Sequence, residues 1–259
     1  MAEAGRLTTA GWPGARQGNW LSYRHLFICA LFSFTAGLVV ASFAGFREFL
    51  PGLLEGAWVT IQITVAACAL AVVCGLLAGL AKMSPYRPLR WFAIGYIELF
   101  RGTSALVQLF WLYYVLPNFG ITLAAIPVAI LALGLNVGAY GAEVVRGAVL
   151  AVPRGQYEAA IALNMSPFTR MRRVILPQAL VAMIPPWGNL FIELLKATAL
   201  VSLITVSDLT FKAYQLNQAT LRTVTIFLLV LVMYLGIALV ITFFMRAVER
   251  YTRKSLGAG

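Results

Sequence analysis

Long apolar stretches without charge are the feature that most limits what this chain can fold into. A bilayer core is crossed by about 20 apolar residues in a helix, and residues 26–45 form such a run without a single Asp, Glu, Lys or Arg. Charged residues make up only 11% of the 259 positions, whereas about a quarter is usual for a soluble domain. The sequence therefore predicts an all-α integral membrane protein.

Apolar runs of spanning length recur along the chain. They cover residues 26–45, 53–81, 89–116, 121–145, 176–205 and 224–245. Because the second run is longer than a bilayer core requires, we expect it to tilt or to protrude into water. Pro117, Asn118 and Gly120 mark a turn between the third and fourth runs. We therefore expect about six transmembrane helices.

The first run has two interpretations. It follows Arg24 and ends near small residues at 42–44, as a cleavable signal peptide would. Its length exceeds that of a usual signal-peptide core, which favours a retained anchor. We therefore expect a tail of residues 1–25 followed by an extra N-terminal transmembrane helix over residues 26–45.

Basic residues are distributed unevenly between the two sides of the predicted membrane. With the N-terminus inside, fifteen of the 20 Lys and Arg residues fall in inside segments and three in outside segments. This positive-inside bias predicts that both termini are cytoplasmic, including the C-terminal tail over residues 249–259. Attraction to anionic lipid of the inner leaflet then accounts for the net charge of +11, and nucleic-acid binding is not expected.

The residues that usually carry chemistry are scarce. His25 is the only histidine, and Cys29, Cys68 and Cys74 lie in apolar runs without the spacing of a metal site. The sequence also lacks the GxxxxGK[ST] motif of P-loop ATPases. We therefore expect no metal, no cofactor and no catalytic residue, so that the chain itself is not an enzyme.

One connection, residues 147–177, is long. Residues 156–163 within it are rich in helix formers, and Asn164 then suits the left-handed position that ends a helix. Ser166 followed by Pro167 predicts the N-cap and first residue of a second helix. The connection should therefore form two short helices joined by a tight turn, with the next span beginning after it.

The surface of the first short helix admits two interpretations. Small side chains at Ala159 and Ala160 would let the helix sit close inside a groove of another protein. The alternative is a solvated amphipathic loop that lies on lipid. The residues alone favour neither.

Several motifs in order along the chain resemble one family of membrane proteins. Glu158-Ala159-Ala160, then Asn164, then a Val-Ile-Leu-Pro end at residues 174–177 are similar to the EAA loop of ABC importer permeases. Further segments resemble the polar amino-acid subgroup, of the histidine, glutamine and arginine type; they read ELFRGT at 98–103, LNVGAY at 135–140, LPQA at 176–179 and LLK at 194–196. The resemblance covers residues 53–250.

The chain departs from the family pattern at a few positions. Asn164 stands where the family usually has Gly, and Ser104 stands where Pro is common. Residues 196–199 read KATA in place of KDTS. The subgroup commonly has five spans, so residues 26–45 look like an addition.

The resemblance implies a fold and a function. Residues 53–248 would be the permease domain, with the last five helices as a type I ABC importer core. The chain would be a subunit of an ATP-driven, binding-protein-dependent importer of polar amino acids or related zwitterions in the bacterial inner membrane. A secondary carrier driven by an ion gradient is the alternative; such carriers often contain internal repeats, and no convincing repeat is present here.

The resemblance also implies partners and site residues. The partners would be cytoplasmic ABC ATPase subunits, a second permease chain that is identical or related, and an extracytoplasmic solute-binding protein. Coupling to the ATPase would fall to Gly155, Glu158, Ala159, Ala160, Asn164 and Pro177.

Charged residues within the spans need a reason, because a charge at the bilayer centre costs at least about 2.5–3.5 kcal/mol. One interpretation is that Glu98 pairs with Arg101, and Glu193 with Lys196, three residues apart on one helix, while Glu143 and Arg146 snorkel to the inner face of the membrane. The other is that they line a polar path for a zwitterion. The candidate pathway residues are Glu98, Arg101, Gln108, Asn136, Glu193 and Lys196.

Overall fold

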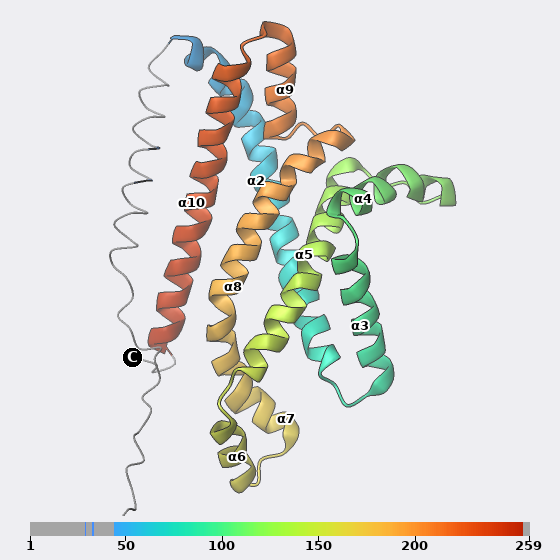
Figure 1. Cartoon of the computed structure of the whole chain (residues 1–259), viewed down its shortest axis with the longest axis vertical. Helices are drawn as coiled ribbons and strands as arrows, with labels where there is room; N and C mark the ends of the chain where they lie inside the picture. The colour runs from blue at the N-terminus through green and yellow to red at the C-terminus, as the bar shows by residue number, and fades with distance from the viewer. Residues whose placement is uncertain (1–28, 30–32, 34–43, 256–259) are drawn as a thin grey trace, which may run out of the picture.

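A computed structural model describes residues 29, 33 and 44–255 of the chain. Every regular element in that part is a helix, and the helices form an elongated bundle (Figure 1). The described helices of spanning length and apolarity are Arg47–Lys82, Ala125–Leu150, Pro167–Ile204 and Thr223–Thr252. The predicted all-α membrane class is confirmed. The predicted tail 1–25 and nearly all of the predicted span 26–45 lie outside the described residues.

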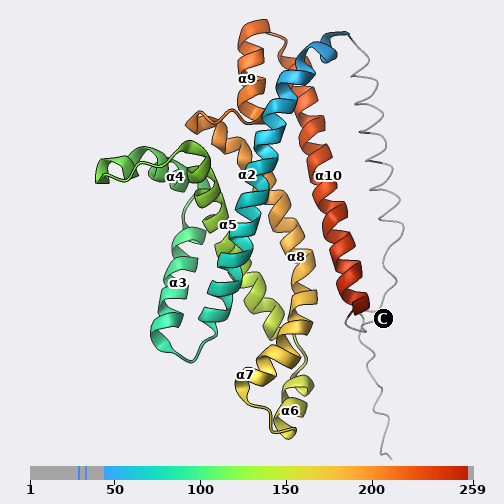
Figure 2. The ribbon, with the colours of Figure 1, turned by 180° about the vertical axis from the view of Figure 1, so that it is seen from behind.

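The helices run back and forth between the two ends of the bundle. In chain order they are α2 (Ala44–Lys82), α3 (Arg87–Gly102), α4 (Ala105–Phe110), η1 (Trp111–Val115), η2 (Leu116–Phe119), α5 (Ala125–Leu150), α6 (Arg154–Ala162), α7 (Pro167–Arg170), η3 (Met171–Ile175), α8 (Leu176–Ala197), η4 (Thr198–Ile204), α9 (Leu209–Thr220) and α10 (Thr223–Ser255). Helices α6 and α7 lie at one end, here called the hairpin end, and α9 lies at the opposite end (Figures 1 and 2).

Four of the five predicted spans in the described part are confirmed with shifted ends. Helix α2 begins at Ala44 instead of residue 53, and α5 covers Ala125–Leu150 instead of residues 121–145. The fifth span corresponds to α8 and η4, which begin at Leu176 as predicted and end at Ile204, and α10 continues to Ser255. The predicted turn after the third run is confirmed, with Gly120 at φ 82° as its left-handed residue.

The third predicted span, residues 89–116, is wrong as a single helix. Helix α3 ends at Gly102, and Thr103 and Ser104 are extended, with φ of −118° and −68°. The chain then turns, and α4 runs across the direction of α3 (Figures 1 and 2). The 16 residues of α3 span about 24 Å, less than a bilayer core of about 30 Å.

Side-chain amides stabilise this break. The Gln108 amide donates hydrogen bonds to the Phe100 carbonyl (2.9 Å) and the Thr103 hydroxyl (2.7 Å). The Asn136 amide, from α5, donates to the same Phe100 carbonyl (2.9 Å) and to the Gln108 side-chain oxygen (3.2 Å). These bonds replace the partners that the last carbonyls of α3 would have found in a longer helix. Gln108 and Asn136 therefore hold the end of α3.

The centre of the bundle depends on small residues that let helices approach closely. The Trp187 ring of α8 lies between Gly75 of α2 and Gly141 of α5. A Cβ atom on Gly75 would lie 2.8 Å from that ring, and one on Gly141 would overlap it. Helices α2, α5 and α8 can therefore pack together only because these two positions lack a side chain.

The opposite end contains a buried carboxyl group. The Asp208 side chain caps α9 by accepting a hydrogen bond from the Phe211 backbone N–H (2.9 Å). It is fully buried, and its second oxygen has no hydrogen-bond partner among the described residues. Burial raises the pKa of Asp208 from 3.8 to about 6, against the lowering effect of nearby N–H donors. Close packing of α9 on α2 excludes water from this cap.

Candidate functional site

The hairpin end carries the long connection that the sequence singled out. The two predicted short helices are confirmed as α6 and α7, and they project beyond α5 and α8 (Figure 1). The Ser166 side chain accepts a hydrogen bond from the Thr169 N–H (3.3 Å), and Pro167 is the first residue of α7. The predicted N-cap is thus confirmed.

The turn between the helices is left-handed, as predicted. Asn164 has φ 54°. The Met165 N–H donates to the Ala160 carbonyl (3.0 Å), and the Asn164 N–H donates to the Ile161 carbonyl (2.8 Å). This pair of bonds is the Schellman motif that closes a helix C-terminus. Asn164 reverses the chain so that α7 can follow.

Two side-chain contacts that sequence reasoning missed fix α6 to the bundle. The Tyr157 hydroxyl donates to the Val149 carbonyl at the end of α5 (3.0 Å), and burial raises the pKa of Tyr157. The Gln178 amide of α8 donates to the Gln156 side-chain oxygen (3.3 Å) and to the Val174 carbonyl (2.9 Å). The one available signal was an aromatic hydroxyl in an otherwise alanine-rich short helix. Helix α6 therefore moves with α5 and α8.

Helix α8 begins at Leu176, as predicted for the fifth span, but it is not separated from the second hairpin helix. The chain is helical without interruption from Pro167 to Ile204, with a π-helical turn over Met171–Ile175. In that turn the Leu176 N–H bonds to the Met171 carbonyl, five residues back. The shifted bonding accommodates the missing N–H of Pro177, which would otherwise leave a gap in the helix.

The hairpin has a buried face and an exposed face. Ala160 is only 2% exposed, so the expectation that it lies open to another protein is wrong. Gly155, Glu158 and Ala159 are exposed. Large apolar side chains lie on the same hairpin and are 58–73% exposed; they are Ile161, Leu163 and Phe168.

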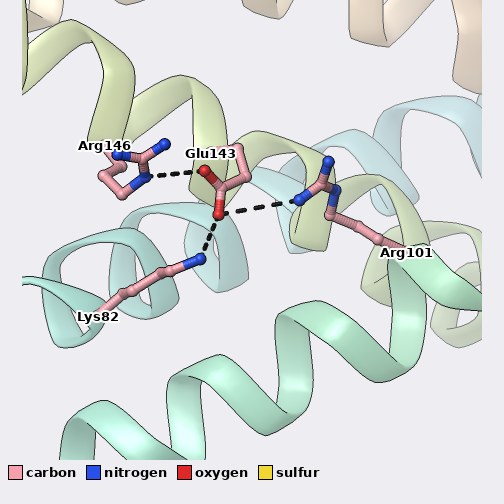
Figure 3. A network of polar contacts seen from close by, with 4 residues as sticks. All are labelled: Lys82, Arg101, Glu143 and Arg146. Carbon is pink, nitrogen blue, oxygen red and sulfur yellow. Dashed lines mark hydrogen bonds and ion pairs between the residues drawn. The ribbon is translucent and has the colours of Figure 1, made fainter.

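Four charged residues meet beside the hairpin end (Figure 3). The Glu143 carboxylate of α5 contacts Lys82 Nζ at 2.6 Å, Arg146 Nε at 2.8 Å and an Arg101 guanidinium nitrogen at 3.9 Å. The sequence had suggested that Glu143 and Arg146 each snorkel to the inner face; they instead pair with each other, and the contacts with Lys82 and Arg101 were not foreseen. One carboxylate thus faces three cations from three helices.

The two intrahelical pairs that the sequence suggested do not form. No ion pair joins Glu98 to Arg101 or Glu193 to Lys196 in the described structure. Arg101 instead lies 5.4 Å from the centre of the Tyr140 ring and turns toward Glu143. Glu98, Glu193 and Lys196 are exposed on the surface of the chain.

The six candidate pathway residues therefore fall into two groups. Arg101, Gln108 and Asn136 make contacts within the chain, at the end of α3 and at Glu143. The other three face outward: they are Glu98 on α3 and Glu193 and Lys196 on α8. The described residues contain no group of three or more His, Cys, Asp or Glu that could hold a metal ion.

Known proteins resemble this chain in sequence and in fold. Residues 71–254 match the family of binding-protein-dependent transport system inner membrane components. A probable amino-acid ABC transporter permease, y4tF of Sinorhizobium fredii, is 51% identical over 209 residues, 78% of this chain and 88% of the relative. The glutamine transport system permease GlnP of Escherichia coli is 39% identical over 203 residues, 78% and 93% of the two chains.

A solved structure has the same fold. It is described as a crystal structure of an amino acid ABC transporter with histidines, and it superposes with a TM-score of 0.76 at 36% sequence identity. The match covers 81% of this chain and 98% of the other.

We expect Glu143→Gln to destabilise the protein, because it leaves Lys82 and Arg146 without a counter-charge in a largely buried position. The cost should be of the order of 2 kcal/mol, less than for a fully buried pair. Glu55→Gln is the control, since the Glu55 side chain is 72% exposed and pairs with Lys212 at 3.1 Å. Melting of the two purified variants in detergent measures the difference. Equal melting temperatures would contradict the assigned importance of Glu143.

We expect Asn164→Gly to keep or slightly raise the stability of the hairpin, since Gly adopts positive φ without a Cβ penalty. Asn164→Val should destabilise it by about 1–2 kcal/mol, because a β-branched residue resists that conformation. Hydrogen exchange of the α6 amides reports the difference. Equal protection of the Gly and Val variants would show that the turn is not held in the left-handed conformation.

Proposed function

Because the chain belongs to the family of binding-protein-dependent transport system inner membrane components, we propose that it is the permease subunit of an ATP-driven importer of polar amino acids or related small zwitterions. This family supplies the membrane-spanning subunit, and ATP is hydrolysed by a separate subunit. The relatives named above are amino-acid permeases, which favours an importer of this kind over a secondary carrier driven by an ion gradient.

The exposed apolar residues of the hairpin carry the proposal. Ile161, Leu163 and Phe168 project beyond the spanning helices, where they would meet water. Clustered exposed apolar side chains mark a surface that binds another protein. We infer that a cytoplasmic ATPase subunit covers them together with Gly155, Glu158 and Ala159. Ala160, Asn164 and Pro177 would act indirectly, by giving the hairpin its shape.

The charge distribution supports an orientation. The basic segments that the sequence assigns to the inside include the end of α2, the start of α3 and the hairpin, and these lie at one end of the bundle (Figure 1). We propose that this end is cytoplasmic and that both tails, residues 1–25 and 249–259, lie there too. Residues 53–248 would form the permease domain, with residues 147–177 as its coupling segment.

The remaining partners follow from the architecture. A solute-binding protein would deliver substrate at the opposite end, near α9. A second permease chain, identical or related, would complete the path. Glu98, Glu193 and Lys196 are charges at membrane depth that require a polar surrounding. We propose that these side chains face the substrate path between the two chains.

The docking proposal is tested by Ala159→Arg, which places a long cation on the exposed face of α6. We expect the variant to reach the membrane normally but to lose ATPase co-purification and ATP-dependent uptake by roughly tenfold, since a charge in the centre of an interface is costly. Ala247→Arg, at an exposed position of α10, is the matched control and should change neither. Retention of both activities by Ala159→Arg would remove the support for docking at this surface.

The pathway proposal is tested by Glu98→Gln, Glu193→Gln and Lys196→Gln. Loss of a charge-assisted hydrogen bond to an ammonium or carboxylate should lower uptake kcat/KM by about tenfold. Arg250→Gln serves as the control, because it removes a charge from an exposed position near the end of α10, away from the proposed docking surface at α9. Wild-type uptake by all three variants would exclude these residues from the path.

A further inference from the structure

An apolar groove lies between α2 and α3. It has a volume of about 750 Å³ and runs along the last turns of α2 and the first turns of α3. Carbon atoms of Leu77, Ala81, Leu89 and Phe92 form much of its walls. The groove is therefore as apolar as the lipid interior that spanning helices meet.

The groove has few polar side chains, and two of them already form hydrogen bonds within the chain. The Tyr96 hydroxyl donates to the Leu135 carbonyl (2.7 Å), and the Ser84 hydroxyl oxygen accepts from the Tyr86 N–H (3.2 Å). A zwitterionic solute would find no charged group on these walls to match its ammonium or its carboxylate. This excludes the groove as part of an amino-acid path and favours a hydrocarbon occupant.

The end of the groove beside the α2–α3 turn is basic. Arg87 and Arg90 lie in the first turn of α3, next to Leu89 of the groove wall. Neither makes an ion pair within the described residues. Glu98, the one acidic residue of α3, lies about two turns further along the helix. The positive charge at this mouth is therefore uncompensated.

Aromatic residues place the same mouth at the membrane surface. Tyr86 and Trp91 are 66% and 71% exposed and flank the two arginines. Tyr and Trp are enriched where the lipid headgroups begin. The apolar groove thus lies at the depth of acyl chains, and the arginines lie at the depth of headgroup phosphates.

We propose that this groove binds an anionic glycerophospholipid, with one acyl chain between α2 and α3 and its phosphate against Arg87 and Arg90. Basic pockets between transmembrane helices on the cytoplasmic side bind such headgroups. That the lipid comes from the inner leaflet depends on the orientation proposed above. The chemical match between an anionic lipid and this groove with its two arginines does not depend on that orientation.

Native mass spectrometry of the full chain in detergent tests the proposal, with phosphatidylglycerol and phosphatidylcholine as probes. Wild type should bind phosphatidylglycerol roughly tenfold more tightly, and Arg87→Gln/Arg90→Gln should lose that preference. Ala81→Phe fills the groove and should weaken both lipids. Arg172→Gln/Arg173→Gln removes the same charge from exposed positions at the same end and should behave as wild type.

Three results would overturn the proposal. Equal affinity of wild type for the two lipids would remove the headgroup contact. Unchanged binding in the Arg87→Gln/Arg90→Gln variant would place the lipid elsewhere. Conversion of a dimer to a monomer by Ala81→Phe, with phosphatidylglycerol binding intact, would show that a second copy of the chain fills the groove. Because the readout is lipid binding and not uptake, none of these results bears on the importer function.

Discussion

Every backbone N–H and C=O at membrane depth must find a partner inside the protein, because lipid offers none. The described part of this chain meets that constraint by being helical almost throughout. Where the helix of residues 89–116 breaks, the amides of Gln108 and Asn136 bind the carbonyl that the break exposes. Where Pro177 removes a donor, a π-helical turn shifts the bonding by one residue. The irregular parts of the bundle follow from the same requirement as its regular parts.

The same constraint sorts the polar side chains of the spans. Some of them find partners inside the chain. The Glu143 carboxylate, for example, forms ion pairs with Lys82, Arg101 and Arg146. The charged side chains without an ion pair inside the described structure lie on the outside of the chain; they are Glu98, Glu193 and Lys196. A charge that faces outward at membrane depth requires water, a substrate or a partner chain. This division is what connects the packing of a single chain to the transport path that we propose.

The hairpin combines a rigid attachment with an adaptable surface. Tyr157 and Gln178 tie α6 to α5 and α8, so a push on α6 is transmitted to two spanning helices that pack against α2 around Trp187. Ile161, Leu163 and Phe168 remain open for a partner. A docked subunit would thus act on the core of the bundle through a short and stiff connection.

Local sequence signals determined a large share of this structure. Apolar runs of spanning length predicted the spans, and Asn164 and Ser166 predicted the hairpin turn and the next N-cap. Each of these depends on residues within one or two turns of helix, where periodicity and capping preferences are reliable.

Only the tertiary structure decided the rest. The break after Gly102 is stabilised by Asn136 on another helix, and Lys82 and Glu143 meet although 61 residues separate them. Ala160 is buried because α6 packs back on its own bundle, which its small side chain alone could not reveal. Contacts between distant segments depend on how helices pack, and one sequence does not specify that packing residue by residue.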